Sequence, residues 1–142
     1  MTVYELRHLF FRCNNDIVCS TKCLGFYLSF ESANQTLQHY YAKPGFSDNQ
    51  DAFSIQERAI SGRVSNKVIY EVILYLHTKD YEFETEIELG LYGSEVYAQD
   101  VLLRYCENNM WLMQAEDLIV EKIINKRVLD QKEWTEGFIV FE

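Results

Sequence analysis

Two stretches of similar sequence decide the fold: GFYLSFESANQTLQHY at residues 25–40 and GLYGSEVYAQDVLLRY at residues 90–105. Six residues recur between them at an offset of 65: Gly25, Tyr27, Ser29, Ala33, Leu37 and Tyr40, matched by Gly90, Tyr92, Ser94, Ala98, Leu102 and Tyr105. Repetition at a nearly constant offset indicates that one structural unit occurs twice in the chain.

Each stretch predicts an α-helix that begins after a serine. Ser29 and Ser94 are good N-cap residues, because a serine oxygen can accept a hydrogen bond from the first turn of a helix. Apolar residues then follow at helical spacing and define one buried face: Phe30, Ala33, Leu37, Tyr40 and Tyr41 in the first helix, and Ala98, Val101, Leu102, Tyr105 and Cys106 in the second. We expect the first helix to stop at residues 43–45 and the second at residues 108–109.

Apolar and aromatic runs on both sides of each helix predict strands. The expected strands are 3–11, 23–28 and 52–60 in the first half, and 68–76, 81–91, 117–124 and 138–141 in the second. The sequence therefore predicts an α+β fold of two tandem β-β-α-β modules, residues 1–65 and residues 66–142, the second with an extra C-terminal strand. Because one such module is at the lower size limit for folding alone, we expect both to pack into one compact pseudo-symmetric body.

The composition is that of a soluble globular protein, with 48% hydrophobic and 25% charged residues. The sequence contains neither a signal-peptide pattern nor an apolar run long enough for a membrane helix, so we expect a cytoplasmic protein. Cys13, Cys19, Cys23 and Cys106 are then expected to be reduced thiols. Their spacing fits none of the usual zinc patterns, and we expect no metal and no cofactor.

The net charge of −9 is unevenly distributed along the sequence. Residues 1–65 contain six basic and six acidic side chains, whereas residues 66–142 contain seven basic and sixteen acidic ones. An acidic protein repels nucleic acid phosphates and attracts basic partners, so we expect neither a nucleic acid nor a membrane partner. The alternative is that the acidity serves solubility alone.

The segment YEFETEIEL at residues 81–89 is the strongest candidate for a binding surface. Side chains alternate between faces along a strand, so Glu82, Glu84, Glu86 and Glu88 are expected on one face, about 6.6–6.8 Å apart. Phe83, Ile87 and Leu89 would then point into a core. The row of carboxylates is either a solvated outer face or an anionic surface that docks on a basic protein.

Trp111 and Trp134 are two further candidates, each as a core residue or as an exposed anchor for a partner. Tyr81 and Tyr92 would extend the same binding surface. His8, His39 and His77 are isolated in the sequence, without the partner groups that a catalytic histidine needs, and we expect His8 and His77 to be structural. No hydrolase, metalloprotease or phosphate-loop motif is present in the sequence, so no catalytic residue is expected.

Several motifs resemble those of small uncharacterised bacterial modules of about 65 residues. Matching residues in the first half are Tyr4, Gly25, Tyr27, Ser29, Pro44, Gly45, Phe46, Asp48, Phe53 and Ile55. Those in the second half are Tyr70, Gly90, Tyr92, Ser94 and the run from Trp134 through Thr135, Glu136 and Gly137 to Phe138. Neither half is complete, since the first lacks the Trp-Thr-Glu-Gly-Phe ending and the second lacks Pro-Gly-Phe. The resemblance implies kinship of fold and no catalytic residue.

In overall type the chain is also similar to the immunity proteins that bacteria encode beside contact-dependent toxins, which are small, acidic and without catalytic motifs. This comparison implies an inhibitor that binds a basic toxin domain, such as a nuclease, through Glu82, Glu84, Glu86 and Glu88 with Trp111 or Trp134 as an apolar anchor. A homo-oligomeric structural or regulatory module, for example a homodimer, is the main alternative. A small enzyme that uses Glu133 or Glu136 with a histidine is a third.

Overall fold

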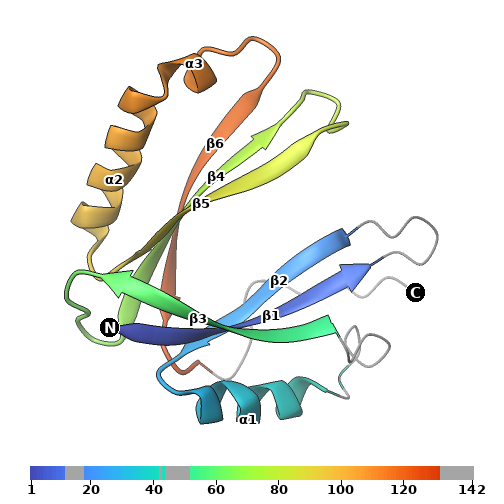
Figure 1. Cartoon of the computed structure of the whole chain (residues 1–142), viewed down its shortest axis with the longest axis vertical. Coiled ribbons are helices and arrows are strands. Elements are labelled where there is room, and N and C mark those ends of the chain that lie inside the picture. The colour runs from blue at the N-terminus through green and yellow to red at the C-terminus, as the bar shows by residue number, and fades with distance from the viewer. Residues whose placement is uncertain (12–17, 42, 44–51, 132–142) are drawn as a thin grey trace. The chain divides into compact units, whose positions relative to one another are not determined.

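The computed structural model describes residues 1–11, 18–41, 43 and 52–131. The elements are strands β1 (Thr2–Phe11), β2 (Val18–Tyr27), β3 (Phe53–Ser61), β4 (Val68–His77), β5 (Glu84–Tyr92) and β6 (Ile119–Val128), with helices α1 (Phe30–Tyr40), α2 (Glu95–Asn108) and α3 (Met110–Met113) (Figure 1). The α+β class is thus confirmed, and the element order is β-β-α-β in the first half of the chain and β-β-α-α-β in the second. The predicted strand at 138–141 lies outside the described residues. Within the described part of the chain, no helix has the length and apolar character needed to cross a membrane.

Contacts divide the chain into two compact units. The terminal unit comprises Thr2–Arg58 and Val128–Glu142, and the central unit comprises Met1 and Ala59–Arg127. Strand β3 begins in the terminal unit and ends in the central unit, because the boundary between Arg58 and Ala59 lies within it. The units therefore differ at their ends from the predicted modules, because the stretch after Arg127 belongs with the N-terminal half of the sequence.

Each unit is acidic. The terminal unit contains six basic and ten acidic side chains, which gives −4, and the central unit contains seven basic and twelve acidic ones, which gives −5. The charge asymmetry between the halves of the sequence consequently does not single out one unit. The reason is that residues 128–142 carry one basic and four acidic side chains and belong to the terminal unit.

In the terminal unit, β1 lies between β2 and β3. Strands β1 and β2 are antiparallel, and Leu24 is an extra residue between the pairs Leu6↔Gly25 and Arg7↔Cys23, which makes a β-bulge. Helix α1 begins as predicted, with Ser29 Oγ accepting the backbone N–H of Ser32 at 3.1 Å. The core cluster under this helix consists of Leu6, Leu24, Tyr27, Ala33 and Tyr40.

The chain after β6 completes this unit. The backbone N–H of Asp130 donates to the carbonyl of Phe26 at 2.9 Å, and the Asp130 carboxylate accepts the backbone N–H of Leu28 at 3.0 Å. The hydroxyl of Tyr27 donates to the carbonyl of Gln131 at 2.9 Å. Burial raises the pKa of Tyr27 to about 12.

In the central unit, β4 lies between β5 and β6, and the end of β3 pairs in parallel with the end of β5. Strands β4 and β5 are antiparallel, and Leu89 is an extra residue between the pairs Val72↔Gly90 and Ile73↔Glu88. Helix α2 packs on this hairpin and is capped by Ser94, whose Oγ accepts the backbone N–H of Tyr97 at 3.2 Å. Its core contains Val72, Tyr92 and Ala98.

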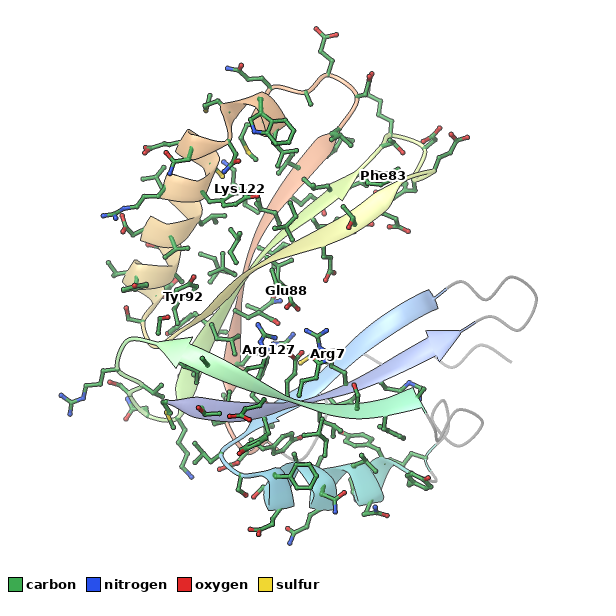
Figure 2. All side chains as sticks on the ribbon, viewed as in Figure 1. Arg7, Phe83, Glu88, Tyr92, Lys122 and Arg127 are labelled. Atoms are coloured by element: carbon green, nitrogen blue, oxygen red, sulfur yellow. The ribbon has the colours of Figure 1, made fainter. Side chains whose placement is uncertain are left out.

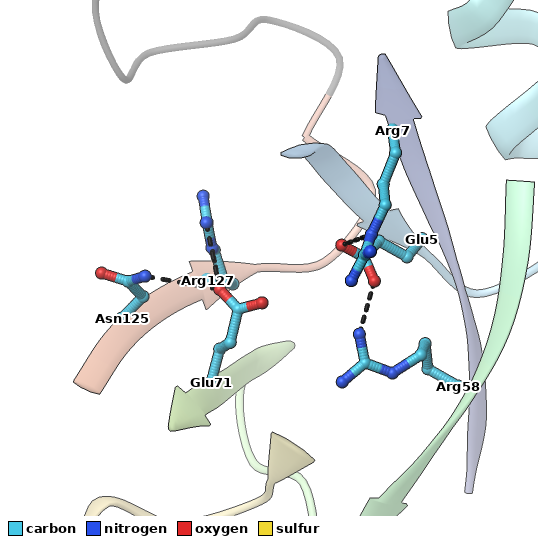
Figure 3. Close-up of polar contacts among 6 residues, drawn as sticks. All are labelled: Glu5, Arg7, Arg58, Glu71, Asn125 and Arg127. Atoms are coloured by element: carbon cyan, nitrogen blue, oxygen red, sulfur yellow. Dashed lines mark hydrogen bonds and ion pairs between the residues drawn. The ribbon is translucent and has the colours of Figure 1, made fainter. Parts of the chain in front are cut away.

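A buried carboxylate lies on the first strand of each hairpin. Glu5 accepts hydrogen bonds from Arg7 at 2.7 Å and Arg58 at 2.5 Å. Glu71 accepts hydrogen bonds from Arg127 at 3.1 Å and Asn125 at 3.4 Å (Figure 3). Glu5 is 1% exposed and Glu71 is 3% exposed, so each needs its arginine to offset the loss of hydration.

Candidate protein-binding surface

The turn between β4 and β5 is fixed by the side chains of Thr78 and Asp80. The Thr78 hydroxyl donates to Asp80 at 2.7 Å, and the same carboxylate oxygen accepts the backbone N–H of Glu82 at 3.2 Å. These two bonds hold the pKa of Asp80 below its usual value. Tyr81 adopts φ +59° in this turn, which is an uncommon conformation for a bulky residue. The turn is thus an ordered platform rather than a loose loop.

The expectation that four glutamates share one strand face is wrong at its first member. Glu82 belongs to the turn, because β5 begins only at Glu84. Phe83, which was expected in the core, is 50% exposed for the same reason and lies at the tip of the hairpin (Figure 2). The hydrogen bonds of the turn extend to Phe83, whose backbone N–H donates to the Thr78 hydroxyl at 3.2 Å. The regular pairing of β4 with β5 therefore starts one residue later, at Glu84.

Glu84, Glu86 and Glu88 do share a face of β5. They pair with His77, Tyr75 and Ile73 of β4, with no register shift between these pairs. All three glutamates are exposed, and Glu88 lies on the side of the hairpin turned away from α2 (Figure 2). Glu84 accepts a hydrogen bond from the Tyr75 hydroxyl, and this bond raises the pKa of Tyr75 to about 12. Glu86 and Glu88 each take part in a hydrogen bond, ion pair or other electrostatic interaction as well, so neither carboxylate is without a partner.

Three aromatic rings stand beside this row of carboxylates. The Tyr81 ring stacks on the His77 ring, with centroids 4.4 Å apart and planes 3° apart. The Tyr75 ring is tilted against His77 at 5.2 Å. His77 is 3% exposed, whereas Tyr81 is 56% exposed, so the tyrosine covers the histidine and presents its own ring to solvent.

The two nitrogens of His77 have different surroundings. Nδ1 lies 2.9 Å from the carbonyl oxygen of Thr78, and since a carbonyl only accepts, Nδ1 carries the hydrogen. Nε2 is buried without a hydrogen-bond partner in the part of the chain that the structure describes. A carboxylate oxygen, Oε1 of Glu121 on β6, lies 3.8 Å from Nε2.

Tyr92 does not extend the binding surface as expected. It is 9% exposed and belongs to the core with Val72 and Ala98. Its hydroxyl donates to the carbonyl of Leu89, and burial raises the pKa of Tyr92. The reason is the register of β4 and β5, because Tyr92 pairs with Tyr70 on the helix-covered face, opposite to the face of Glu88.

Trp111 is the second exposed feature of the central unit. It is 73% exposed on α3, and its neighbour Met110 is 48% exposed, while Leu112 between Trp111 and Met113 is buried. A tryptophan exposed to this extent is unusual unless it contacts a partner. Trp134, the other predicted anchor, lies outside the described residues, as do Glu133 and Glu136.

The remaining candidates are the cysteines and the histidines. Cys23 is half-buried and Cys106 is buried. Among the described residues, no group of three or more His, Cys, Asp or Glu side chains is arranged to hold a metal ion. His8 and His77 lie buried in β1 and β4, the strands in which they were expected.

Comparisons with protein-family models, with curated proteins and with solved structures find no match for this chain. The surface on the β4–β5 hairpin therefore has to be interpreted from its own chemistry.

Sequence reasoning missed the association of Tyr75, His77 and Tyr81 with Glu121. The period-two spacing of Tyr75 and His77 places both on one face of a strand, so part of the signal was available. Tyr81 reaches this face only through its positive φ, and Glu121 only through the pairing of β6 with β4. Neither relationship can be read from local sequence.

Proposed function

We propose that this protein is a non-catalytic, immunity-type inhibitor that neutralises a bacterial toxin domain by direct binding, and that the toxin domain is basic, as in a nuclease. The observation that carries the proposal is the exposure of Glu84, Glu86 and Glu88 on one face of a paired strand. Carboxylates at strand spacing present a regular negative surface. A positively charged protein surface is its natural counterpart.

The proposal needs affinity as well as attraction. Charges on the rim of an interface mainly speed the encounter, whereas buried aromatic anchors supply most of the binding energy. Trp111 and Tyr81 are both large and more than half exposed, and both belong to the central unit. An interface of about 800 Å² on each partner is the usual size for a stable complex of this kind.

The finer architecture and the location are parts of the same proposal. Two β-β-α-β modules in one pseudo-symmetric body would give a rigid scaffold for the surface. The matched β-bulges before Gly25 and Gly90 and the matched serine caps support this relationship between the halves. An immunity protein of this kind would act in the cytoplasm, where the toxin domain arrives.

The first step of the test is to look immediately upstream for a gene that encodes a large secreted protein, whose C-terminal domain would be the candidate toxin. A triple variant, Glu84→Gln, Glu86→Gln and Glu88→Gln, is compared with a control, Glu95→Gln, Glu107→Gln and Glu116→Gln, which removes the same charge from exposed positions elsewhere in the central unit. We expect the first variant to slow association about tenfold or more at low salt and to flatten its dependence on ionic strength. The control should retain at least half of the association rate.

Equal effects of both triple variants would show that only net charge matters. Unimpaired binding after Lys substitution at all three positions would exclude the row as the contact surface. Failure of the full-length chain to bind the toxin domain or to protect cells from it would remove the proposed function. The homo-oligomer alternative is tested by light scattering, where we expect a monomer in the absence of the toxin. A stable dimer without any partner would favour that alternative.

A further inference from the structure

We propose that the aromatic cluster of Tyr75, His77 and Tyr81, bordered by Glu84 and Glu121, is a receptor for the guanidinium group of an arginine side chain on the partner protein. This inference rests on the proposed function and names the contact through which a basic partner would be recognised. It concerns one position on the hairpin, separate from the general attraction of the carboxylate row.

The first argument is a missing hydrogen-bond donor. In the Nδ1–H tautomer of His77, which the Thr78 carbonyl favours, Nε2 is an acceptor. It faces Oε1 of Glu121, another acceptor, at 3.8 Å, and no donor among the described residues reaches Nε2. Two acceptors at this separation leave a position for one N–H group that donates to either or both. A buried acceptor without a donor costs free energy, so a ligand that supplies the donor is favoured.

The second argument is the shape and charge of the surroundings. The Tyr75 and Tyr81 rings flank His77, and aromatic faces attract flat cations. Glu84 pairs with His77 from β5, and Glu121 approaches the same histidine from β6, so one carboxylate stands on each side of the aromatic cluster. Lys122, the nearest cation in sequence to Glu121, lies toward the α2 side of the sheet (Figure 2). The aromatic cluster thus has a carboxylate on each side.

These features select arginine over the other cations. A guanidinium group is flat, stacks on aromatic rings, and carries five N–H donors, more than enough for His77 Nε2 and the Glu121 carboxylate that lies 3.8 Å from it. An ammonium group is a compact point charge that is strongly hydrated, and it gains less from the ring faces. A metal ion is disfavoured, because no third ligand of a suitable type joins His77 and Glu121 among the described residues.

Access to Nε2 requires only surface groups to move. Glu121 is 54% exposed and Tyr81 is 56% exposed, and both therefore have room to change rotamer. Tyr81 lies over His77 with a backbone φ of +59°. This conformation is strained for a tyrosine and costs free energy in the unliganded protein. An arginine that separates Glu121 from His77 would still leave the Thr78 bond of Nδ1 in place.

The experiment titrates the full-length protein with Nα-acetyl-arginine amide and follows the imidazole nitrogens of His77 by NMR. We expect a saturable change at Nε2 with a dissociation constant in the millimolar range, as one side chain can supply only a few kcal/mol. Nα-acetyl-citrulline amide has the same shape without the charge and should bind at least about tenfold more weakly. Nα-acetyl-lysine amide should bind more weakly than the arginine compound.

Two variants localise the binding. Glu121→Gln and Tyr81→Leu should each weaken arginine binding about fivefold or more, whereas Glu107→Gln, an equal change of charge at an exposed site on α2, should not. Equal binding of citrulline or lysine would overturn the inference, and so would the absence of a saturable change. A crystal structure in which only a water molecule bridges His77 and Glu121, undisplaced by arginine, would overturn it as well.

The two proposals can fail separately. If the arginine compound does not bind but the toxin complex still depends on Glu84, Glu86 and Glu88, this receptor is wrong and the proposed function stands. If no toxin complex forms while arginine binds at His77, the proposed function fails and the receptor site remains.

Discussion

The hydroxyl oxygen of Tyr92 lies 2.8 Å from the position that a Cβ atom on Gly90 would occupy. The tyrosine ring folds back over the glycine two residues earlier, on the same face of β5. Tyr27 covers Gly25 in the same way, with 2.7 Å between its hydroxyl and the corresponding Cβ position. In both hairpins the glycine follows the extra residue of a β-bulge and has a positive φ, +154° at Gly25 and +118° at Gly90.

Gly90→Ala should therefore destabilise the protein by about 1–3 kcal/mol, since it adds a steric clash to a strained backbone. Urea unfolding measures this change. The control is Gly62→Ala, where φ is also positive, at +85°, but the nearest atom to a Cβ is the Gly93 nitrogen at 3.8 Å. Combining Gly90→Ala with Tyr92→Phe should cost less than the sum of the single changes, because the hydroxyl is the closest contact. Full additivity would contradict the clash.

The raised pKa of Tyr27 predicts a loss of stability in alkali. Burial raises this pKa to about 12 in the folded protein, above the ordinary value of 10.0 in the unfolded chain. The folded state therefore holds the proton more tightly, and the free energy of unfolding should fall as pH rises from about 10 through 12. Tyr27→Phe should make the free energy of unfolding depend less steeply on pH in this range, because one titrating group is removed. An unchanged slope would show that Tyr27 does not carry the effect.

Tyr75 offers a test of the hairpin surface without any partner. Its hydroxyl donates to Glu84, so ionisation of the phenol would put two negative charges together. In Glu84→Gln the pKa of Tyr75 should fall from about 12 toward the ordinary value, as followed by NMR of ζ-carbon-labelled tyrosine. Glu107→Gln is the matched control and should leave the Tyr75 titration unchanged. Equal shifts in both variants would mean that only net charge is involved.

Removing the Glu71 carboxylate should destabilise the central unit strongly. Arg127 is 14% exposed, and Glu71→Leu would remove the buried carboxylate that accepts hydrogen bonds from its Nε and Nη2. We expect a loss of about 3–5 kcal/mol in urea unfolding, part of which Arg127→Met should restore in the double variant. Asp100→Asn, which breaks the exposed pair with Arg104, should change stability by less than about 0.5 kcal/mol. Similar losses at Glu71 and Asp100 would contradict this account.

Trp111 and Leu112 are adjacent but should behave oppositely. Trp111→Ala should change stability by less than about 0.5 kcal/mol, because the side chain is 73% exposed, yet it should weaken partner binding by about 2 kcal/mol or more. Leu112→Ala should lower stability by about 2–5 kcal/mol, because that side chain is 5% exposed. Thermal unfolding and binding calorimetry separate the two effects. Partner binding that is unaffected by Trp111→Ala would exclude it as an anchor.

The helices were the most predictable part of the fold. Ser29 and Ser94 cap them as expected, because a cap and an apolar stripe are local properties of the chain. The start of β5 was predicted three residues early, since Glu82 alternates correctly in sequence but is held in a turn by Asp80. Local alternation cannot distinguish a strand from a turn that continues the same pattern.

The binding surface was predictable only where it depends on strand periodicity. Glu84, Glu86 and Glu88 follow directly from the alternation of side chains. Tyr92 was misplaced because the bulge at Leu89 adds one residue, so the face that each residue occupies changes beyond it. Glu121 was absent from the predicted surface because it comes close to His77 only through the pairing of β6 beside β4 in the sheet, which the local sequence does not show.

The return of the chain after β6 to Phe26, Tyr27 and Leu28 imposes an order on biosynthesis. A ribosome releases residues 59–127 before Asp130 and Gln131, so the central unit is fully synthesised while the terminal unit still lacks its last contacts. Domains usually fold in the order in which they emerge. Here the segment that is translated first must wait for the segment that is translated last, and a chain truncated after Arg127 and released from the ribosome should resist proteases in the middle of its sequence better than at its beginning.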